Sequence, residues 1–211
     1  MSLTLVIGTK RFSSWSLRPW YAMKVAGIAF DEAIIELRQP ETKTEILKWS
    51  PSGKVPLLID GAVKVWDSLA IGEYLAERFP AAGLWPDAPE TRAVARAVAA
   101  EMHSGFMPTR QVCSMDVLAD TPLIDIPVDV AADLARLDAI MSDCRTRFGA
   151  GGPFLFGRFS YADAMYSALA TRVRTYRLPL GPVAAAYCDT LLAQPAMAEW
   201  IKGAAEPPEG R

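Results

Sequence analysis

A proline-rich stretch at residues 80–89 divides the 211-residue chain into two parts of different sequence texture, and it constrains the fold more than any other feature. Pro80, Pro86 and Pro89 lie close together, with Ala and Gly common between them. Such a cluster is typical of a linker. Before it, strand-like and helix-like runs alternate, and after it almost every run is helical. The sequence therefore predicts an α/β domain at residues 1–80, a linker at 81–90 and an all-helical domain at 91–211.

The first part has the pattern of a sheet with crossover helices. Strand-like runs cover residues 3–7, 33–37, 55–59 and 62–65, and helix-like runs cover residues 16–26 and 67–79. Gly27 ends the first helix. Residues 39–50 are polar, with Pro40 as a breaker. Asp60-Gly61 stands between the last two strand-like runs and predicts a hairpin, because this turn needs positive φ.

The second part is expected to be entirely helical. Apolar residues at helical spacing predict helices over residues 91–104, 128–148, 160–176 and 183–192. Pro108, Pro122 and Pro127 break the region between the first two. Ser160 and Asp163, three positions apart, predict a capping box at the start of the third helix.

Charge and composition exclude several classes of function. A formal net charge of −2 argues against a nucleic-acid partner, because a phosphate-binding surface needs a basic excess. No apolar stretch approaches the roughly 20 residues that a bilayer requires, and the first residues do not resemble a leader peptide. We therefore expect no membrane contact and a cytoplasmic location. Cys113, Cys144 and Cys188 are widely spaced and odd in number, which predicts free thiols and no metal site.

Three serines crowd the start of the first predicted helix. Proline at position 19 is tolerated only in the opening turn of a helix, so the helix must begin near residues 14–16. Ser13, Ser14 and Ser16 then lie at a helix N-terminus, where free amides and the helix dipole favour an anion. A thiol bound there, with an ordinary pKa of about 8.5, would be pulled towards thiolate. Ser is also a preferred N-cap, so plain capping is the alternative interpretation.

Three motifs together resemble the glutathione transferase superfamily, and the resemblance runs over nearly the whole chain. They are residues 11–18 (RFSSWSLR), residues 53–58 (GKVPLL) and residues 66–71 (WDSLAI). The chain is most similar to serine-type, zeta-like members. This resemblance implies a thioredoxin-like, glutathione-binding domain followed by an all-α domain, glutathione as a co-substrate with no metal, and a homodimer.

The resemblance carries the thiol-activating role onto the serine cluster. In serine-type members a hydroxyl of the Ser-Ser-x-Ser run donates to the glutathione sulfur, which gives Ser13 or Ser14 as the catalytic residue here. We favour Ser14 narrowly, because Pro19 sets the helix start near it. Ser16 is expected to contribute to glutathione binding.

The other two motifs supply the remaining glutathione contacts in family members. The bond between Val55 and Pro56 is expected to be cis, with the Val55 backbone pairing to the cysteinyl part of glutathione like an added strand. Lys54 would meet the glycyl carboxylate. Asp67 would face the γ-glutamyl ammonium, and Ser68 with the first-turn amides would receive the γ-glutamyl carboxylate. An edge-strand proline, a solvated lysine and a plain Asp N-cap are the structural alternatives.

Residues further along the chain are candidates for the second-substrate pocket. The segment 102–111 lies where family members line that pocket, and it loosely resembles a zeta-class segment. The candidates are His103, Phe106, Met107, Arg110 and Arg174. The arginines would suit an anionic substrate, although surface positions and core packing are the simpler interpretations.

The leading prediction is a detoxifying transferase that conjugates the glutathione thiolate to a small hydrophobic electrophile. A zeta-like glutathione-dependent cis-trans isomerase of the maleylacetoacetate type is the alternative enzyme. A non-catalytic binding protein that keeps the fold is the third hypothesis.

Overall fold

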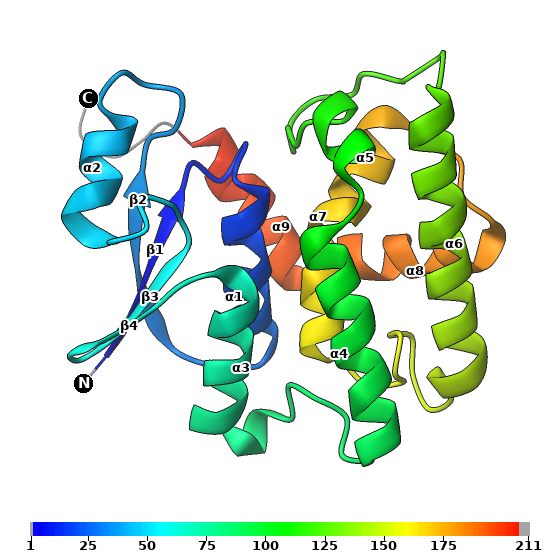
Figure 1. Cartoon of the computed structure of the whole chain (residues 1–211), viewed down its shortest axis with the longest axis horizontal. Helices are drawn as coiled ribbons and strands as arrows, with labels where there is room; N and C mark the ends of the chain where they lie inside the picture. Colours follow the sequence, from blue (N-terminus) through cyan, green and yellow to red (C-terminus); the bar gives the residue numbers. More distant parts are fainter. Residues whose placement is uncertain (1, 207–211) are drawn as a thin grey trace.

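The computed structural model describes residues 2–206, in which a four-stranded sheet with its helices adjoins a second group of helices (Figure 1). The strands are β1 (Leu3–Gly8), β2 (Phe30–Ile35), β3 (Leu57–Asp60) and β4 (Val63–Val65), in the spatial order β2-β1-β3-β4. β1 and β2 run parallel, whereas β3 runs antiparallel to both β1 and β4. This mixed sheet confirms the predicted thioredoxin-like first domain.

The central strand β1 points alternate side chains into two separate cores, as the period of a strand requires. The helices of this part are α1 (Ser14–Val25), α2 (Thr42–Trp49) and α3 (Ser68–Arg78). Leu5 and Ile7 join the large core with α1 and α3, whereas Val6 joins a smaller core with Ile46 of α2. Figure 1 shows the same division, with α2 on one face of the sheet and the other two helices on the opposite face.

Several local predictions for the first part are confirmed, and others are wrong in detail. The α1 helix begins at Ser14, within the predicted range, but Pro19 is its sixth residue and lies inside the helix, beyond the first turn. Gly61 adopts the positive φ of 57° that its hairpin requires. However, β2 occupies Phe30–Ile35 and not residues 33–37, and residues 39–50 contain the α2 helix. Pro40 stands before this helix, where it breaks nothing, and Ile46 is the one buried residue of α2. Such a helix shows no apolar stripe in its sequence.

The second part consists of helices joined by loops, the longest of which are residues 113–127 and 149–160. Its helices are α4 (Pro89–Ser104), α5 (Met107–Val112), α6 (Val128–Phe148), α7 (Tyr161–Tyr176), α8 (Pro182–Leu192) and α9 (Pro195–Ala205), and a short 3-10 turn (Pro80–Ala82) precedes them. The four predicted helices are therefore confirmed. We did not predict α5, which begins with a proline in its first turn, or α9, which includes Gly203. Residues 207–211 of the predicted domain lie outside the described residues.

The α7 helix lies at the centre of the helical part, with nearly every side chain buried. The predicted capping box forms at its start, because the Ser160 N–H donates to Asp163 Oδ2 at 2.8 Å. Asp163 Oδ1 also accepts from the Leu155 N–H and the Tyr187 hydroxyl. This buried carboxylate therefore ties the helix start to a preceding loop and to α8.

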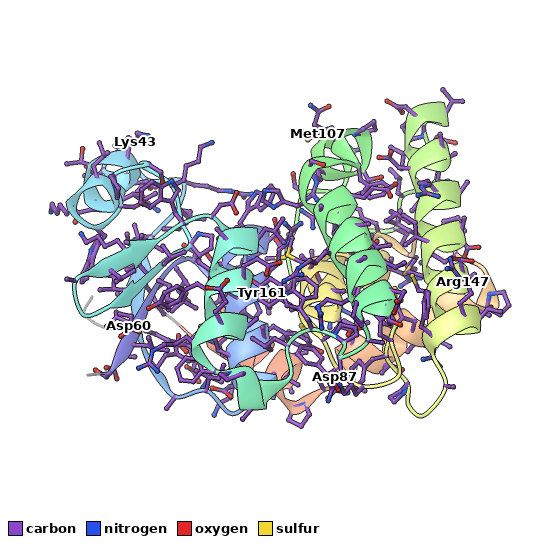
Figure 2. All side chains as sticks on the ribbon, turned by 60° about the horizontal axis from the view of Figure 1, so that its bottom comes forward. Lys43, Asp60, Asp87, Met107, Arg147 and Tyr161 are labelled. Atoms are coloured by element: carbon purple, nitrogen blue, oxygen red, sulfur yellow. The ribbon has the colours of Figure 1, made fainter. Side chains whose placement is uncertain are left out.

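Both parts share one continuous hydrophobic core. Tyr161 of α7 lies between them (Figure 2), and its hydroxyl donates to the main-chain oxygen of Ser68 at the start of α3. On the other side of α1, the Trp20 ring packs edge-on against Trp200 of α9, with centroids 5.0 Å apart. These contacts fix the helical part against the middle of α1 and the N-terminal end of α3. Within residues 2–206, no helix is long and apolar enough to cross a bilayer.

Candidate active site

A cavity of about 550 Å³ lies where the two parts meet. Its walls come from the start of α1, the loop before β3, the start of α3 and the end of α4. The lining residues are Trp15, Ser52, Lys54, Val55, Pro56, Trp66, Asp67, Ser68 and His103. Five of the predicted glutathione-binding residues are therefore brought together, although they come from two separate motifs. A larger hollow of about 810 Å³ lies among the ends of β1, β2, β3 and α3 and the loop at residues 26–29, and we assign no chemistry to it.

The three serines at the start of α1 differ in what their hydroxyls do. Ser13 Oγ donates to Ser16 Oγ at 2.7 Å, and Ser16 Oγ accepts from the Gly8 N–H at 3.0 Å. These two hydroxyls thus connect the end of β1 to α1. Ser14 is 7% exposed. Its Oγ has no hydrogen-bond partner among the described residues, and this atom is not fully buried. Ser14 is therefore the serine whose hydroxyl is free to meet a ligand, and it adjoins the cavity-lining Trp15.

The loop before β3 presents an unpaired backbone edge to the cavity. The Val55–Pro56 peptide bond is cis, as the resemblance implies. β3 begins only at Leu57, and the N–H and C=O of Val55 have no partner in the part of the chain that the structure describes. Lys54 is exposed at the cavity rim, and Ser52, which we did not predict, accepts from the Lys54 N–H at 3.2 Å. An extended peptide would find both a donor and an acceptor at Val55.

Asp67 and Ser68 stand at the start of α3, after a cis bond between Trp66 and Asp67. Asp67 Oδ1 caps the helix, since it accepts from the N–H groups of Leu69 at 2.9 Å and Ala70 at 3.3 Å. The plain N-cap interpretation of Asp67 is therefore correct, but its other oxygen is not used by the cap. The Ser68 hydroxyl is buried and has no hydrogen-bond partner among residues 2–206. It is an available donor at the cavity wall.

Of the predicted second-substrate residues, only His103 lines this cavity. Its Nε2 lies 3.0 Å from Asp67 Oδ2, so α4 contacts the start of α3 here. Burial is the largest cause that lowers the pKa of His103, and the nearby charges of Arg18 and Arg110 lower it further, against the Asp67 carboxylate. At neutral pH the imidazole is therefore uncharged.

The other four candidates lie elsewhere. Phe106 is packed in the core, and Met107 is 51% exposed at the outer end of α5 (Figure 2). Arg110 donates to main-chain oxygens of Gly105 and Met102, and Arg174 donates to the Val117 oxygen at 2.7 Å. These arginines brace the backbone, and neither lines the cavity.

Trp15 and Trp66 are cavity residues that sequence reasoning missed. Trp15 stands between two serines at a helix start, where a large aromatic side chain has no capping role. This unusual residue type at a helix start could have indicated a cavity residue. Trp66 directly precedes the Asp-Ser pair. The two indoles give the cavity flat apolar walls beside its polar groups.

The cysteines play no part in the site. All three are buried, and burial raises the pKa of Cys144 to about 11 and that of Cys188 to about 12. Among the described residues, no group of three or more His, Cys, Asp or Glu side chains is arranged to hold a metal ion.

A mixed four-stranded sheet followed by a helical domain, with a polar cavity where they meet, defines a two-domain thioredoxin-like protein. Comparison with known proteins gives the family. Residues 12–78 match the family model for the glutathione S-transferase N-terminal domain, and residues 127–203 match that for the C-terminal domain. The two matches together cover more than half of the chain, which belongs to the glutathione S-transferase family.

Curated relatives include a probable maleylacetoacetate isomerase from Caenorhabditis elegans, 34% identical over 107 residues, which are 50% of each chain. A zeta-class glutathione S-transferase from Euphorbia esula is 27% identical over 145 residues, 66% of this chain and 64% of that one. The chain spans about half or less of the length of the first curated relatives that it matches.

Solved structures show the same fold over nearly the full length. A glutathione transferase homologue from Burkholderia, solved with bound glutathione, has a TM-score of 0.72 and 23% identity, with 98% of this chain and 100% of that chain covered. A glutathione transferase from Methylococcus capsulatus has a TM-score of 0.69 and 24% identity, with 96% and 98% covered.

Proposed function

We propose that this chain is a glutathione transferase that joins the glutathione thiolate to a small hydrophobic electrophile. The cavity is the observation that carries the proposal, because it gathers an unpaired Val55 backbone, an unpartnered Ser68 hydroxyl and the start of α1. These are the groups that an extended tripeptide thiol needs. The Burkholderia homologue of the same fold holds glutathione.

The proposed pose follows from the chemistry of each wall. The cysteinyl backbone pairs with Val55 as an added strand. The γ-glutamyl carboxylate meets the hydroxyl and the N–H of Ser68, because Asp67 already accepts from the next two amides of α3. The γ-glutamyl ammonium faces Asp67. The glycyl carboxylate lies towards Lys54. The thiol then points to the start of α1.

In the proposed reaction, Ser14 donates a hydrogen bond to the sulfur and stabilises the thiolate together with the helix N-terminus. The thiol proton passes to solvent. The sulfur electron pair attacks the electrophilic carbon, so a carbon–sulfur bond forms while the leaving group departs with its bonding electrons. The cavity holds both reactants together, which removes the entropic cost of their encounter.

Serine substitutions test this proposal. We expect Ser14→Ala to lower turnover with a chloronitrobenzene-type electrophile by about 10²-fold, the usual loss for a donor that stabilises a developing or resident anion, with glutathione affinity retained. Ser13→Ala should have a smaller effect, because its hydroxyl is used by Ser16. Ser104→Ala, whose hydroxyl bonds within α4 at the exposed surface, is the matched control. Equal rates for Ser14→Ala and wild type would refute the assignment of Ser14.

A glutathione-dependent cis-trans isomerase is the second candidate, favoured by the similarity to the probable maleylacetoacetate isomerase. It requires the thiolate to add to a conjugated diacid and to leave again after bond rotation. Turnover of maleyl-type diacids with no consumption of glutathione supports this candidate, and its absence removes it. Glutathione binding without turnover of either substrate class would instead indicate a binding protein.

We also propose that the protein is a cytoplasmic homodimer that acts in detoxification, as the family resemblance implies. Light scattering tests the assembly directly: twice the mass of one chain supports the dimer, and the mass of a single chain contradicts it.

A further inference from the structure

A buried arginine lies directly behind the cavity wall. Arg18 of α1 is 0% exposed, and all three of its guanidinium nitrogens lack a hydrogen-bond partner among the described residues. Buried charges are normally paired, because an unpaired one loses its hydration without compensation. A cation in this state requires an explanation beyond packing.

The cationic neighbours of Arg18 add to its positive potential. Burial is the largest cause that lowers the pKa of Arg18, and the charges of Arg110 from α5 and Arg172 from α7 lower it further. Arg110 and Arg172 direct their Nε–H groups at main-chain oxygens, at 2.9 and 2.8 Å respectively, and not at a carboxylate. A guanidinium nevertheless keeps its proton at neutral pH. Three positive charges therefore share this part of the domain boundary.

The groups that oppose this potential are weak or already used. Tyr161 of α7 and Asp67 at the start of α3 raise the pKa of Arg18. The Tyr161 hydroxyl is neutral at physiological pH, because burial raises its pKa. Asp67 is half-exposed, caps α3 and faces His103 of α4. Neither group makes a hydrogen bond to the Arg18 guanidinium.

Trp15 separates Arg18 from the cavity. Arg18 follows Ser14 by four positions and Trp15 by three, and helical side chains lean towards the N-terminus of their helix. Its Cζ lies 4.3 Å from the Trp15 ring centroid, and Arg110 Cζ lies 5.0 Å from the same ring. Trp15 lines the cavity, and the Arg18 charge lowers the pKa of His103, another lining residue. The positive field therefore reaches the place where the proposed thiolate forms.

We propose that Arg18 is a positioning residue of this reaction, which keeps the bound glutathione sulfur ionised by a fixed positive field from behind Trp15. The inference rests on the proposed function. When the thiol proton leaves to solvent, the sulfur retains the electron pair and supplies the negative charge that the ligand-free site lacks. The Arg18 charge is therefore compensated only when the glutathione thiolate is bound.

The test compares Arg18→Met with Arg136→Met, an exposed arginine of α6 that pairs with Glu101 on the surface. The ultraviolet absorbance of the thiolate gives the pKa of bound glutathione in each protein. We expect this pKa to rise by about one unit in Arg18→Met, which is about tenfold less thiolate below the pKa, and to stay unchanged in Arg136→Met. An unchanged thiol pKa in folded Arg18→Met overturns the inference.

Two further measurements separate this role from a structural one. S-methylglutathione has no ionisable thiol, so its affinity should change by less than about twofold in Arg18→Met. Removal of an unpaired buried charge should leave the thermal midpoint of the unliganded protein equal or raised. A lower midpoint with equal losses for both ligands indicates packing alone and overturns the inference.

His103 reports the same field without any ligand. It is the single histidine of the chain, so its imidazole resonance in an NMR titration is unambiguous. The pKa of His103 should be higher in Arg18→Met than in wild type, and an unchanged value overturns the proposed reach of the field.

A second pair of variants serves if Arg18→Met does not fold. Arg18→Lys should keep the wild-type pKa of the glutathione thiol, whereas Arg18→Gln should raise it, and equal values in both contradict the inference. If wild-type protein binds no glutathione, the proposed function fails and the inference with it, whereas a failed thiol shift in a binding protein refutes only the inference.

Discussion

Replacing Asp163 with alanine removes the carboxylate that organises the start of α7. Oδ1 accepts from the Leu155 N–H at 3.0 Å and the Tyr187 hydroxyl at 2.9 Å. Oδ2 accepts from the N–H and the hydroxyl of Ser160, at 2.8 and 2.9 Å. Asp163 itself is fully buried. Four donors therefore lose their acceptor together.

The four donors do not cost the same when they are left unpaired. The two hydroxyls can rotate towards other acceptors, whereas the main-chain N–H groups of Leu155 and Ser160 are fixed by the backbone. Each buried N–H without a partner costs about 1–3 kcal/mol. We therefore expect Asp163→Ala to lower the free energy of unfolding by about 4 kcal/mol, which is about 8–16 °C in the melting temperature for a chain of this size.

Urea denaturation followed by circular dichroism measures this loss. The matched control is Asp143→Ala on α6, where the carboxylate pairs with Arg147 one turn later and both side chains are 54% exposed. That exposed pair is worth at most about 1 kcal/mol. Equal urea midpoints for Asp163→Ala and Asp143→Ala would refute the argument that the buried Asp163 carboxylate ties the start of α7 to the preceding loop and to α8.

Three smaller effects also follow from the packing and the titrating groups. Gly72→Ala places a Cβ against the Tyr161 ring, so we expect a loss of about 1–3 kcal/mol in denaturation experiments, and an unchanged midpoint contradicts the close approach of α3 and α7. His103 should titrate below its ordinary pKa of 6.5 by NMR, because burial outweighs the carboxylate that it faces. The unfolded chain then binds this proton more tightly, so the free energy of unfolding falls as pH drops through 6.5, and His103→Gln should remove that part of the acid sensitivity. Cys144 and Cys188, with pKa values of about 11 and about 12, should react with a thiol reagent only after denaturation, and rapid labelling of native protein refutes their burial.

Local structure was easiest to predict where a residue allows few backbone conformations. Pro19 placed the start of a helix near residues 14–16, and α1 does begin at Ser14, although Pro19 stands at the sixth position of this helix and not in its first turn. Asp60-Gly61 could form only a tight turn, and the hairpin is there. The proline-rich stretch separated the sheet from the helices for the same reason. These restrictions act within a few residues, so one sequence suffices to predict them.

What could not be predicted depends on contacts between distant segments. α2 is polar on most of its surface, because it covers the sheet only through Ile46, and its sequence has no stripe. The Asp67–His103 contact and the stacking of Arg18 and Arg110 on Trp15 join residues from different elements. Nothing in a linear pattern reports such pairs.

The same distinction between local and long-range contacts applies to the candidate site. The clustering of Val55 and Ser68 at one cavity could be predicted from motifs, and the different hydroxyl contacts of Ser13 and Ser14 could not. Which serine meets the sulfur, and what the second substrate is, stay predictions. Phe106 lies in the core at a break between α4 and α5, where its own φ is 61°, and helical spacing does not encode such a break.

A crystal structure of the protein soaked with glutathione tests the central claim most directly. We predict the cysteinyl N–H and C=O within hydrogen-bond reach of the Val55 backbone, and the sulfur within reach of Ser14 Oγ. A tripeptide bound away from Val55, or a sulfur that faces no serine hydroxyl, would contradict it.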